Sequence, residues 1–188
     1  MAIRNTTNVS KPAGQTITGQ VPPNFKGTLI LRIKDALFGP SKSSQQPQIT
    51  WKCEVVSPLE WKSDYEGENG NTYSLDSKEI NMYLSLSEVK KDGSPSDNLD
   101  YIINKLHPLL GLPQEIDDEN PNLEQYKGLC FQVIAETQER LEQRRKPDGS
   151  YEQIKDAEGN VISRGWEWKM IGMKDIIKKA TATAGRQF

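Results

Sequence analysis

The longest run of strand-like sequence in this chain is Gly128-Leu-Cys-Phe-Gln-Val-Ile-Ala-Glu-Thr-Gln-Glu-Arg-Leu-Glu142. A polar segment follows over residues 143–160, in which Pro147-Asp148-Gly149 and Glu158-Gly159-Asn160 are typical of chain reversals. The chain then returns through a second strand-like segment, Val161-Ile-Ser-Arg-Gly-Trp-Glu-Trp-Lys-Met-Ile171. Together these segments predict one long, protruding β-hairpin whose tip carries basic residues.

The composition is that of a soluble, loop-rich domain. Hydrophobic residues make up 35% and charged residues 27% of the 188 positions, with 14 Gly and 11 Pro. This length suits one domain with a sizeable core. No apolar run approaches the roughly 20 residues that span a bilayer, and the N-terminus lacks the apolar core of a secretory signal. We therefore expect a cytoplasmic protein without a membrane partner.

The two cysteines, Cys53 and Cys130, lie within strand-like patterns and far apart in the sequence. This placement favours buried thiols over a disulfide framework or a metal knuckle. A disulfide between them stays open as an alternative, although cytosolic conditions disfavour it.

Ahead of the long hairpin, the sequence predicts a flexible arm and three strands. Residues 1–24 are rich in Thr, Asn, Gln and Pro and have only scattered apolar residues, as flexible arms do. Alternating apolar residues predict half-buried strands over 25–34, 49–56 and 80–86. A polar excursion over 57–77 separates the last two strands and has room for a small hairpin.

Apolar residues at helical spacing predict a helix between the third strand and the long hairpin. Pro108 is expected to end this helix near Leu106, because proline clashes with the preceding helical turn. His107 is the only histidine, and its position at this helix end predicts a surface or capping role. A last short helix is expected over residues 174–180.

Three strands, a helix and two more strands follow one another in the order of the OB-fold, a five-stranded antiparallel β-barrel. We therefore expect a mainly β protein with an OB-fold-like barrel over residues 25–180, interrupted by insertions over 57–77 and 143–160. A C-terminal tail follows over 181–188. Each strand has one apolar face, as a filled barrel requires. Other small barrels and α+β sandwiches fit the same order of elements.

Four segments carry a resemblance to a known family: Lys26-Gly-Thr-Leu-Ile-Leu-Arg-Ile33, Ile49-Thr-Trp-Lys-Cys-Glu-Val-Val56, Leu110-Gly-Leu-Pro113 and Tyr126-Lys-Gly-Leu-Cys-Phe-Gln-Val133. Over residues 25–173 the chain resembles the OB-fold single-stranded DNA-binding proteins of tailed bacteriophages. The resemblance implies a viral protein that binds single-stranded DNA in the host bacterial cytoplasm. It also implies a role in DNA replication and recombination, with phage proteins of those processes as partners. Such proteins often have an acidic tail with a terminal aromatic residue, whereas this chain ends in Phe188 after the basic residues Lys178, Lys179 and Arg186.

Charge is unevenly distributed along the chain. The whole sequence has 24 Lys or Arg and 26 Asp or Glu, for a net charge of −2. From residue 140 to the C-terminus, 11 basic residues stand against 7 acidic ones. A locally positive segment attracts anionic partners even on a mildly acidic protein, because the field depends on local arrangement. An ordinary solvated surface would carry the same charges.

Binding of single-stranded DNA requires cationic groups for phosphates and aromatic rings for unstacked bases. Polar strand faces and loops supply both, and Arg144-Arg145-Lys146 is the best single cluster. The full set of candidate binding residues is Arg32, Lys34, Lys52, Trp61, Tyr65, Tyr73, Tyr83, Arg144, Arg145, Lys146, Tyr151, Lys155 and Arg164. Ordinary packing is the competing interpretation for each aromatic residue, and it is favoured for Trp51, Trp166 and Trp168.

Two other functions stay open. A virion structural protein or adaptor would use the hairpin and the arm for contacts between subunits, and self-association fits either function. A Mg²⁺-dependent nuclease is the second alternative, because Asp148, Glu167 and Lys169 match a Pro-Asp…Glu-x-Lys pattern. Asp148 lies in a Pro-Asp-Gly turn, however, where it serves turn formation. Because the sequence has no phosphate-binding loop or nucleophile motif, we expect no enzyme activity, no cofactor and no metal site.

Overall fold

The chain forms two structural units in this computed structural model, which describes residues 14–64, 70–90 and 92–181. What we call the barrel unit consists of Gly27–Leu59, Leu75–Ala135 and Met170–Phe188. What we call the fork unit consists of Met1–Lys26, Glu60–Ser74 and Glu136–Lys169. One strand, β7 (Cys130–Leu141), contributes its first half to the barrel unit and its second half to the fork unit.

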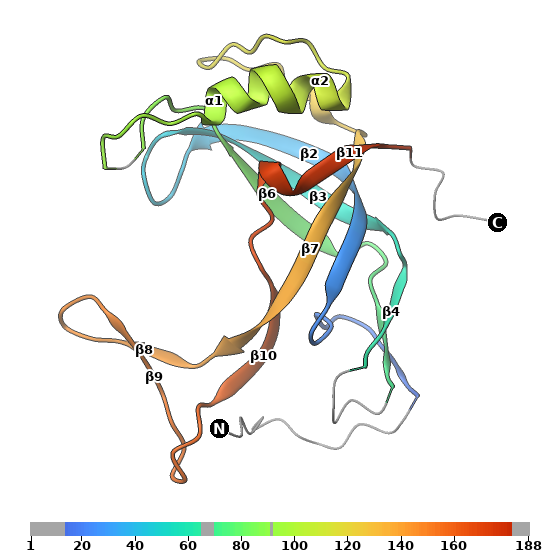
Figure 1. Ribbon diagram of the computed structural model, residues 1–188, viewed down its shortest axis with the longest axis vertical. Coiled ribbons are helices and arrows are strands. Elements are labelled where there is room, and N and C mark those ends of the chain that lie inside the picture. Colours follow the sequence, from blue (N-terminus) through green and yellow to red (C-terminus); the bar gives the residue numbers. More distant parts are fainter. Residues whose placement is uncertain (1–13, 65–69, 91, 182–188) are drawn as a thin grey trace. The chain divides into compact units, whose positions relative to one another are not determined.

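The barrel unit is built from strands that each have one apolar face. Its sheet has the order β7-β2-β3-β6, and β11 also pairs with β7. The bounds are Lys26–Pro40 for β2, Pro47–Ser57 for β3, Glu79–Ser85 for β6 and Ile176–Ala180 for β11. β3 pairs antiparallel with both β2 and β6. The sheet curls into a nearly closed, barrel-like form (Figure 1), so the protein is mainly β, as the sequence predicts.

The interior of the barrel unit is apolar. Residues on the predicted inward faces are fully buried, among them Leu31, Trp51 and Met82. Trp51 packs between the rings of Tyr126 and Phe131, at centroid distances of 5.2 and 5.7 Å. The predicted half-buried strands and the predicted core role of Trp51 are therefore confirmed.

Both cysteines lie inside the barrel unit, and both are free thiols. Burial raises the pKa of Cys53 to about 12, which keeps this group protonated at neutral pH. The prediction of buried thiols is confirmed.

The helix between β6 and β7 continues past the proline at which the sequence predicts its end. It runs as α1 (Asn98–Tyr101), a π-helical turn η1 (Ile102–Leu106) and α2 (His107–Leu110). The prediction that Pro108 ends the helix near Leu106 is wrong. The wider π turn just before Pro108 relieves the clash of the proline ring and tolerates its missing N–H.

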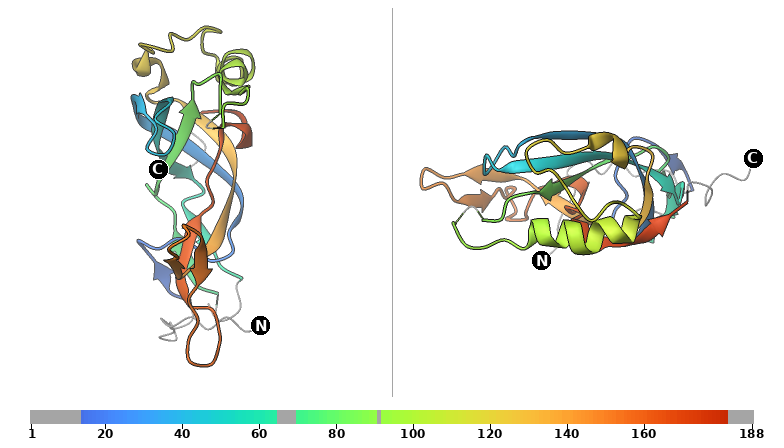
Figure 2. Two further views of the ribbon diagram at one scale, coloured as in Figure 1. Left: turned by 90° about the vertical axis from the view of Figure 1, so that its left-hand side faces the viewer. Right: turned by 90° about the horizontal axis from the view of Figure 1, so that it is seen from above.

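The helix ends at Gly111, whose φ of 73° lies in the left-handed region that favours glycine. Beyond it, Leu112 N–H donates to the carbonyl of His107 at 2.8 Å, which satisfies a carbonyl of the last turn. α1 contacts β6 and α2 contacts β11, so the helix lies across one end of the barrel unit (Figures 1 and 2). Among the described residues, no helix is long and apolar enough to cross a membrane.

His107 is fully buried, so the predicted surface or capping role is wrong. Its Nδ1–H donates to the carbonyl of Pro113 at 2.6 Å, which leaves Nε2 to accept the hydroxyl of Tyr126 at 3.0 Å. Tyr126 ends the 3₁₀ turn η2 (Leu123–Tyr126) just before β7. Burial lowers the pKa of His107 and raises that of Tyr126 to about 12. The neutral imidazole thus ties the helix to the two ends of the loop that follows it.

Acid is expected to weaken the fold through His107. Because burial lowers the pKa of the folded state below the ordinary value of 6.5, the unfolded chain binds more protons in this pH range. The stability contributed by the neutral ring is therefore complete above pH 6.5 and is lost as the pH falls toward the pKa of the folded state. His107 is the only histidine, so its imidazole signals in an NMR titration report this pKa directly.

Urea unfolding of the wild type and of His107→Gln at several pH values provides the control. The free energy of unfolding should fall more steeply in mild acid for the wild type, because glutamine does not titrate. An imidazole that titrates at or above the ordinary histidine pKa would contradict the argument from burial.

The chain returns to the barrel unit as a strand where the sequence predicts a helix over residues 174–180. A 3₁₀ turn, η3 (Met173–Asp175), leads into β11, which pairs antiparallel with the first half of β7. Lys and Ala favour a helix in isolation, but Ile176 is buried in the barrel unit and β7 offers a backbone partner. These tertiary contacts outweigh the helix propensity of the segment, which therefore forms a strand. β11, and not the predicted strand over 161–171, is therefore the strand that joins β7 in the barrel unit.

The fork unit contains a small sheet with the order β1-β5-β4. The bounds are Thr16–Ile17 for β1, Thr72–Ser74 for β5 and Glu60–Lys62 for β4. β4 and β5 pair antiparallel, which confirms the small hairpin predicted in the excursion over 57–77. β1 pairs parallel with β5 and belongs to the stretch predicted as an arm, whose first 13 residues lie outside the described part of the chain.

Phe25 is the centre of the apolar core of the fork unit. Its ring meets Trp61 and Trp168 edge-on, at centroid distances of 4.8 and 5.2 Å. Its N–H donates to Thr137 Oγ1 at 2.8 Å, and its carbonyl accepts the N–H of Thr137 at 2.9 Å. The predicted packing role of Trp168 is confirmed.

The predicted long hairpin is a ladder that divides into two short hairpins. β10 (Ser163–Trp168) pairs antiparallel with the second half of β7. Beyond this ladder, Glu142, Ile154 and Ile162 close a ring of three backbone hydrogen bonds of 2.8, 2.9 and 3.1 Å. The first prong joins β8 (Gln143–Arg145) to β9 (Tyr151–Gln153), and the second prong spans residues 155–161 (Figure 1). The prediction of a single hairpin is therefore corrected to a fork.

Both prongs end in turns of the same kind. In the first prong Lys146 N–H donates to the carbonyl of Ser150 at 2.8 Å, and Gly149 has a φ of 85°. The second prong repeats this arrangement with Gly159, whose φ is also 85°. Glycine adopts this left-handed conformation without steric cost, which explains the two turn signals in the sequence.

Candidate nucleic-acid interface

The first prong of the fork has two chemically different faces. Arg144, Lys146 and Glu152 share one of them. Arg144 Nε donates to Glu152 Oε1 at 3.1 Å, and Lys146 Nζ lies 3.3 Å from Glu152 Oε2. The hydrogen bond from Arg144, followed by that from Lys146, lowers the pKa of Glu152. One ionised carboxylate thus engages both cations of this face.

The opposite face of the first prong, which we call the open face, consists of Gln143, Arg145, Tyr151 and Gln153. The register pairs Gln143 with Gln153 and Arg145 with Tyr151. All four residues are exposed, and Tyr151 retains 65% of its accessible surface. Arg145 forms no ion pair with any residue that the structure describes. Where an unpaired guanidinium lies beside an exposed aromatic ring, the guanidinium can bind a phosphate while the ring stacks on the base of the same nucleotide.

The outer face of the barrel unit is a second candidate surface. Across β3 and β6, Thr50 pairs with Tyr83, and Lys52 pairs with Asn81. Tyr83 is 46% exposed. Lys52 is exposed and makes no ion pair within the described ranges. A stacking ring and an available ammonium group therefore lie two rungs apart on the same ladder and on the same face of it.

Arg32 and Lys34 of β2 are held by carboxylates. Arg32 donates to Glu54 through Nε at 2.7 Å and also through Nη2. Lys34 Nζ lies 3.2 Å from Glu79 Oε1 and 3.9 Å from Glu54 Oε2. Glu54 is only 7% exposed, and a carboxylate so placed needs a cationic partner. Arg32 therefore serves to neutralise Glu54. Because Arg32 and Lys34 both have carboxylate partners, they are less available to phosphates than Lys52.

The predicted aromatic residues fall into different environments. Trp61 packs in the core of the fork unit, as its competing interpretation proposed. Tyr73 is 1% exposed, and a buried ring cannot stack on a base, so Tyr73 leaves the candidate set. Tyr65 lies outside the described residues. Tyr83 and Tyr151 are the exposed aromatic residues that remain.

The other predicted cations belong to the fork unit. Lys155 of the second prong is exposed and has no ion pair among the residues described. Arg164 of β10 donates to Glu142 Oε1 at 2.5 Å. The candidates within the barrel unit are Arg32, Lys34, Lys52 and Tyr83, and the others that the structure describes are in the fork unit.

The residues of the nuclease-like pattern are engaged in the fold. Asp148 Oδ1 accepts the N–H and the hydroxyl of Ser150 at 2.9 and 2.6 Å, which is the turn-forming role expected of it. Glu167 accepts a hydrogen bond from a glutamine of β7, and Lys169 donates to a glutamate of β7. In the described ranges, no group of three or more His, Cys, Asp or Glu residues is arranged to hold a metal ion.

Sequence reasoning missed the glutamines of the open face and treated the basic cluster as one group. The turn at Pro147-Asp148-Gly149 was a signal from which the two faces of the first prong could have been predicted. A turn of this kind sets the register of a short hairpin, so it places Arg145 opposite Tyr151 and turns Arg144 to the other face. The sequence matches no protein-family model, and no curated protein matches it significantly.

Proposed function

We propose that the protein binds single-stranded DNA without catalysis and with little sequence preference. The observation that carries the proposal is the open face, where Arg145 lies opposite an exposed Tyr151. A tyrosine ring can stack on any base and a guanidinium can bind any phosphate, so such a surface tolerates any sequence. Stacking needs unpaired bases, which favours single strands over duplexes. Tyr83 and Lys52 offer the same two groups in the barrel unit.

The strand order supports an OB-fold as the framework. β2, β3 and β6 are successive neighbours, a helix follows, and β7 returns beside β2 with β11 on its other side. OB-folds bind oligonucleotides on the face of their second and third strands and on the loops between strands 1 and 2 and between strands 4 and 5. Within the barrel unit of this chain, the corresponding parts are the face of β3 and β6 and the turn over residues 41–46.

We infer the biological role from the resemblance to phage single-stranded DNA-binding proteins. In that role the protein covers exposed strands during phage DNA replication or recombination in the host bacterial cytoplasm. Its protein partners are then other phage replication or recombination proteins. The strand binds through side chains alone, without a cofactor.

A titration with fluorescent oligo-dT at low and high salt, with a duplex of equal length as the control, tests the proposal. The affinity for the single strand should fall steeply as salt rises, because binding of phosphates releases counterions. The duplex should bind much more weakly. Absence of oligo-dT binding at both salt concentrations would refute the proposal. Self-association that persists at high salt, as apolar interfaces do, would then favour the assembly role.

A further inference from the structure

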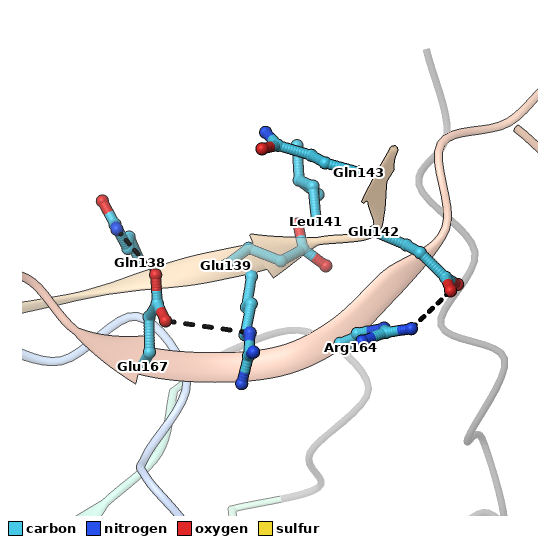
Figure 3. Close-up of a pocket in the computed structure, with 8 residues that line it drawn as sticks. Gln138, Glu139, Leu141, Glu142, Gln143, Arg164 and Glu167 are labelled. Carbon is cyan, nitrogen blue, oxygen red and sulfur yellow. Dashed lines mark hydrogen bonds and ion pairs between the residues drawn. The ribbon is translucent and has the colours of Figure 1, made fainter. Parts of the chain in front are cut away.

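A polar cleft of about 390 Å³ opens on the fork unit along β7 and β10 (Figure 3). The lining residues that matter here are Gln138, Arg140, Glu142, Gln143, Arg164 and Glu167. Gln143 also belongs to the open face, so the cleft and the open face meet at this residue.

Two guanidinium groups line this cleft, and they are held differently. Arg164 donates to Glu142 at 2.5 Å. Arg140 Nε lies 4.0 Å from one oxygen of Glu167, whose other oxygen accepts the Gln138 amide at 2.9 Å. Arg140 is thus only loosely paired, whereas Arg164 has a close carboxylate partner.

The backbone of β10 is irregular at Arg164 and Gly165. The register with β7 shifts between Ser163 and Trp166, which leaves Arg164 and Gly165 outside the regular pairing. Gly165 has a φ of 97°, a conformation that favours glycine. Bulges of this kind redirect side chains and are common beside functional sites. This observation is independent of charge, and it places Arg164 within the irregular part of β10.

We propose that the cleft is a phosphate subsite for the bound strand and that Glu142 occupies this subsite in the free protein. A carboxylate and a phosphate both offer paired oxygens to a guanidinium. Glu142 therefore stands where a strand phosphate binds Arg164, and the strand must displace it. The proposal rests on the proposed function, because it extends a strand bound at the open face into the cleft. Its consequence is that Glu142 lowers the affinity for DNA.

Glu142→Gln tests this competition, because glutamine keeps the shape of the side chain and removes its charge. The affinity for oligo-dT should rise by about two- to fivefold, the effect expected when one exposed ion pair no longer competes. The salt dependence should change by less than about 0.7, the value of one single-strand phosphate contact, because the wild type makes the same contact once Glu142 is displaced. Glu139→Gln is the matched control, since Glu139 lines the same cleft and forms no ion pair with the described residues. Its effect should stay below about twofold.

Arg164→Gln completes a double-mutant cycle. If Glu142 acts through Arg164, the gain from Glu142→Gln should vanish in the Arg164→Gln background. A gain that survives there, or equal gains from Glu142→Gln and Glu139→Gln, would overturn the inference and leave the proposed function standing. A wild-type protein that does not bind oligo-dT would overturn the proposed function and the inference with it.

NMR of the wild type gives an answer that depends on no variant. The guanidinium signals of Arg164, whose Nη2 donates to Glu142 in the free protein, should shift on addition of oligo-dT, because the partner of this guanidinium changes from a carboxylate to a phosphate. Binding of oligo-dT that leaves the guanidinium signals of Arg164 unmoved would also overturn the inference.

Discussion

Alanine at both Arg145 and Tyr151 is expected to reduce the affinity for oligo-dT by roughly 100-fold. Loss of one stacked base costs about 1–3 kcal/mol. Loss of the guanidinium removes a phosphate contact and lowers the slope of the salt dependence by about 0.7, the value for one contact with a single strand. Because both side chains project from an exposed face, their removal should leave the fold intact, which far-UV circular dichroism checks. The affinity and its salt slope come from the same fluorescence titration.

The single variants Arg144→Ala and Arg145→Ala form a matched pair. Each removes one positive charge from β8, but Arg144 is held by Glu152, and Arg145 is unpaired within the described residues. We expect Arg144→Ala to weaken binding much less than Arg145→Ala. Equal losses would mean that the total charge of the prong matters and the open face does not. Tyr151→Phe should retain most of the affinity, because the ring still stacks.

Replacement of Trp51 by alanine should lower the free energy of unfolding by about 3–5 kcal/mol. The side chain is fully buried, and its removal leaves a cavity beside Tyr126 and Phe131. Because single domains are stabilised by only about 5–15 kcal/mol, this is a large share of the total. Urea unfolding followed by far-UV circular dichroism measures the change.

Trp51→Phe is the control for the cavity. It keeps an aromatic ring in the core and removes the indole Nε1–H, which has no hydrogen-bond partner among the described residues. An unpaired buried donor costs about 1–3 kcal/mol, so its removal offsets part of the lost packing. Trp51→Phe should therefore lose clearly less stability than Trp51→Ala. Losses of equal size would contradict the cavity as the cause.

The strands of the barrel unit were predictable because a short segment of alternating apolar and polar residues is enough to indicate a strand with one buried face. Ile49, Trp51 and Cys53 alternate with polar residues, and only an extended chain places all three on one side. The turns of the two prongs were predictable for a similar reason, since Gly149 and Gly159 permit a conformation that few other residues adopt.

Features that depend on distant partners were not predictable. β11 resembles a short helix until β7 offers it a backbone to pair with. His107 lies beside a proline and suggests a helix end, yet the π turn continues the helix and buries the imidazole against Tyr126. The fork was also not predictable from the sequence, because its junction joins Glu142 to backbone groups that are 12 and 20 positions further along the chain.

The composition of the candidate site was only partly predictable. The sequence identifies which residues are cationic or aromatic, but their availability depends on neighbours from other strands. Arg32 meets Glu54 across β2 and β3, which a list of charges does not reveal. Tyr73 is buried although polar residues surround it in the sequence. Arg145, in contrast, follows from the turn beside it, because that turn sets the hairpin register.

Three backbone hydrogen bonds join Glu142, Ile154 and Ile162, and they allow each of the two prongs to change independently of the other. The junction is complete without either tip, so a change in the length of one prong does not shift the register of the other. Exposed loop tips are also where chains best tolerate insertions. Evolution can therefore vary the contact residues of one prong while the rest of the unit stays unchanged, and a peptide tag inserted at Gly159 should leave the first prong undisturbed.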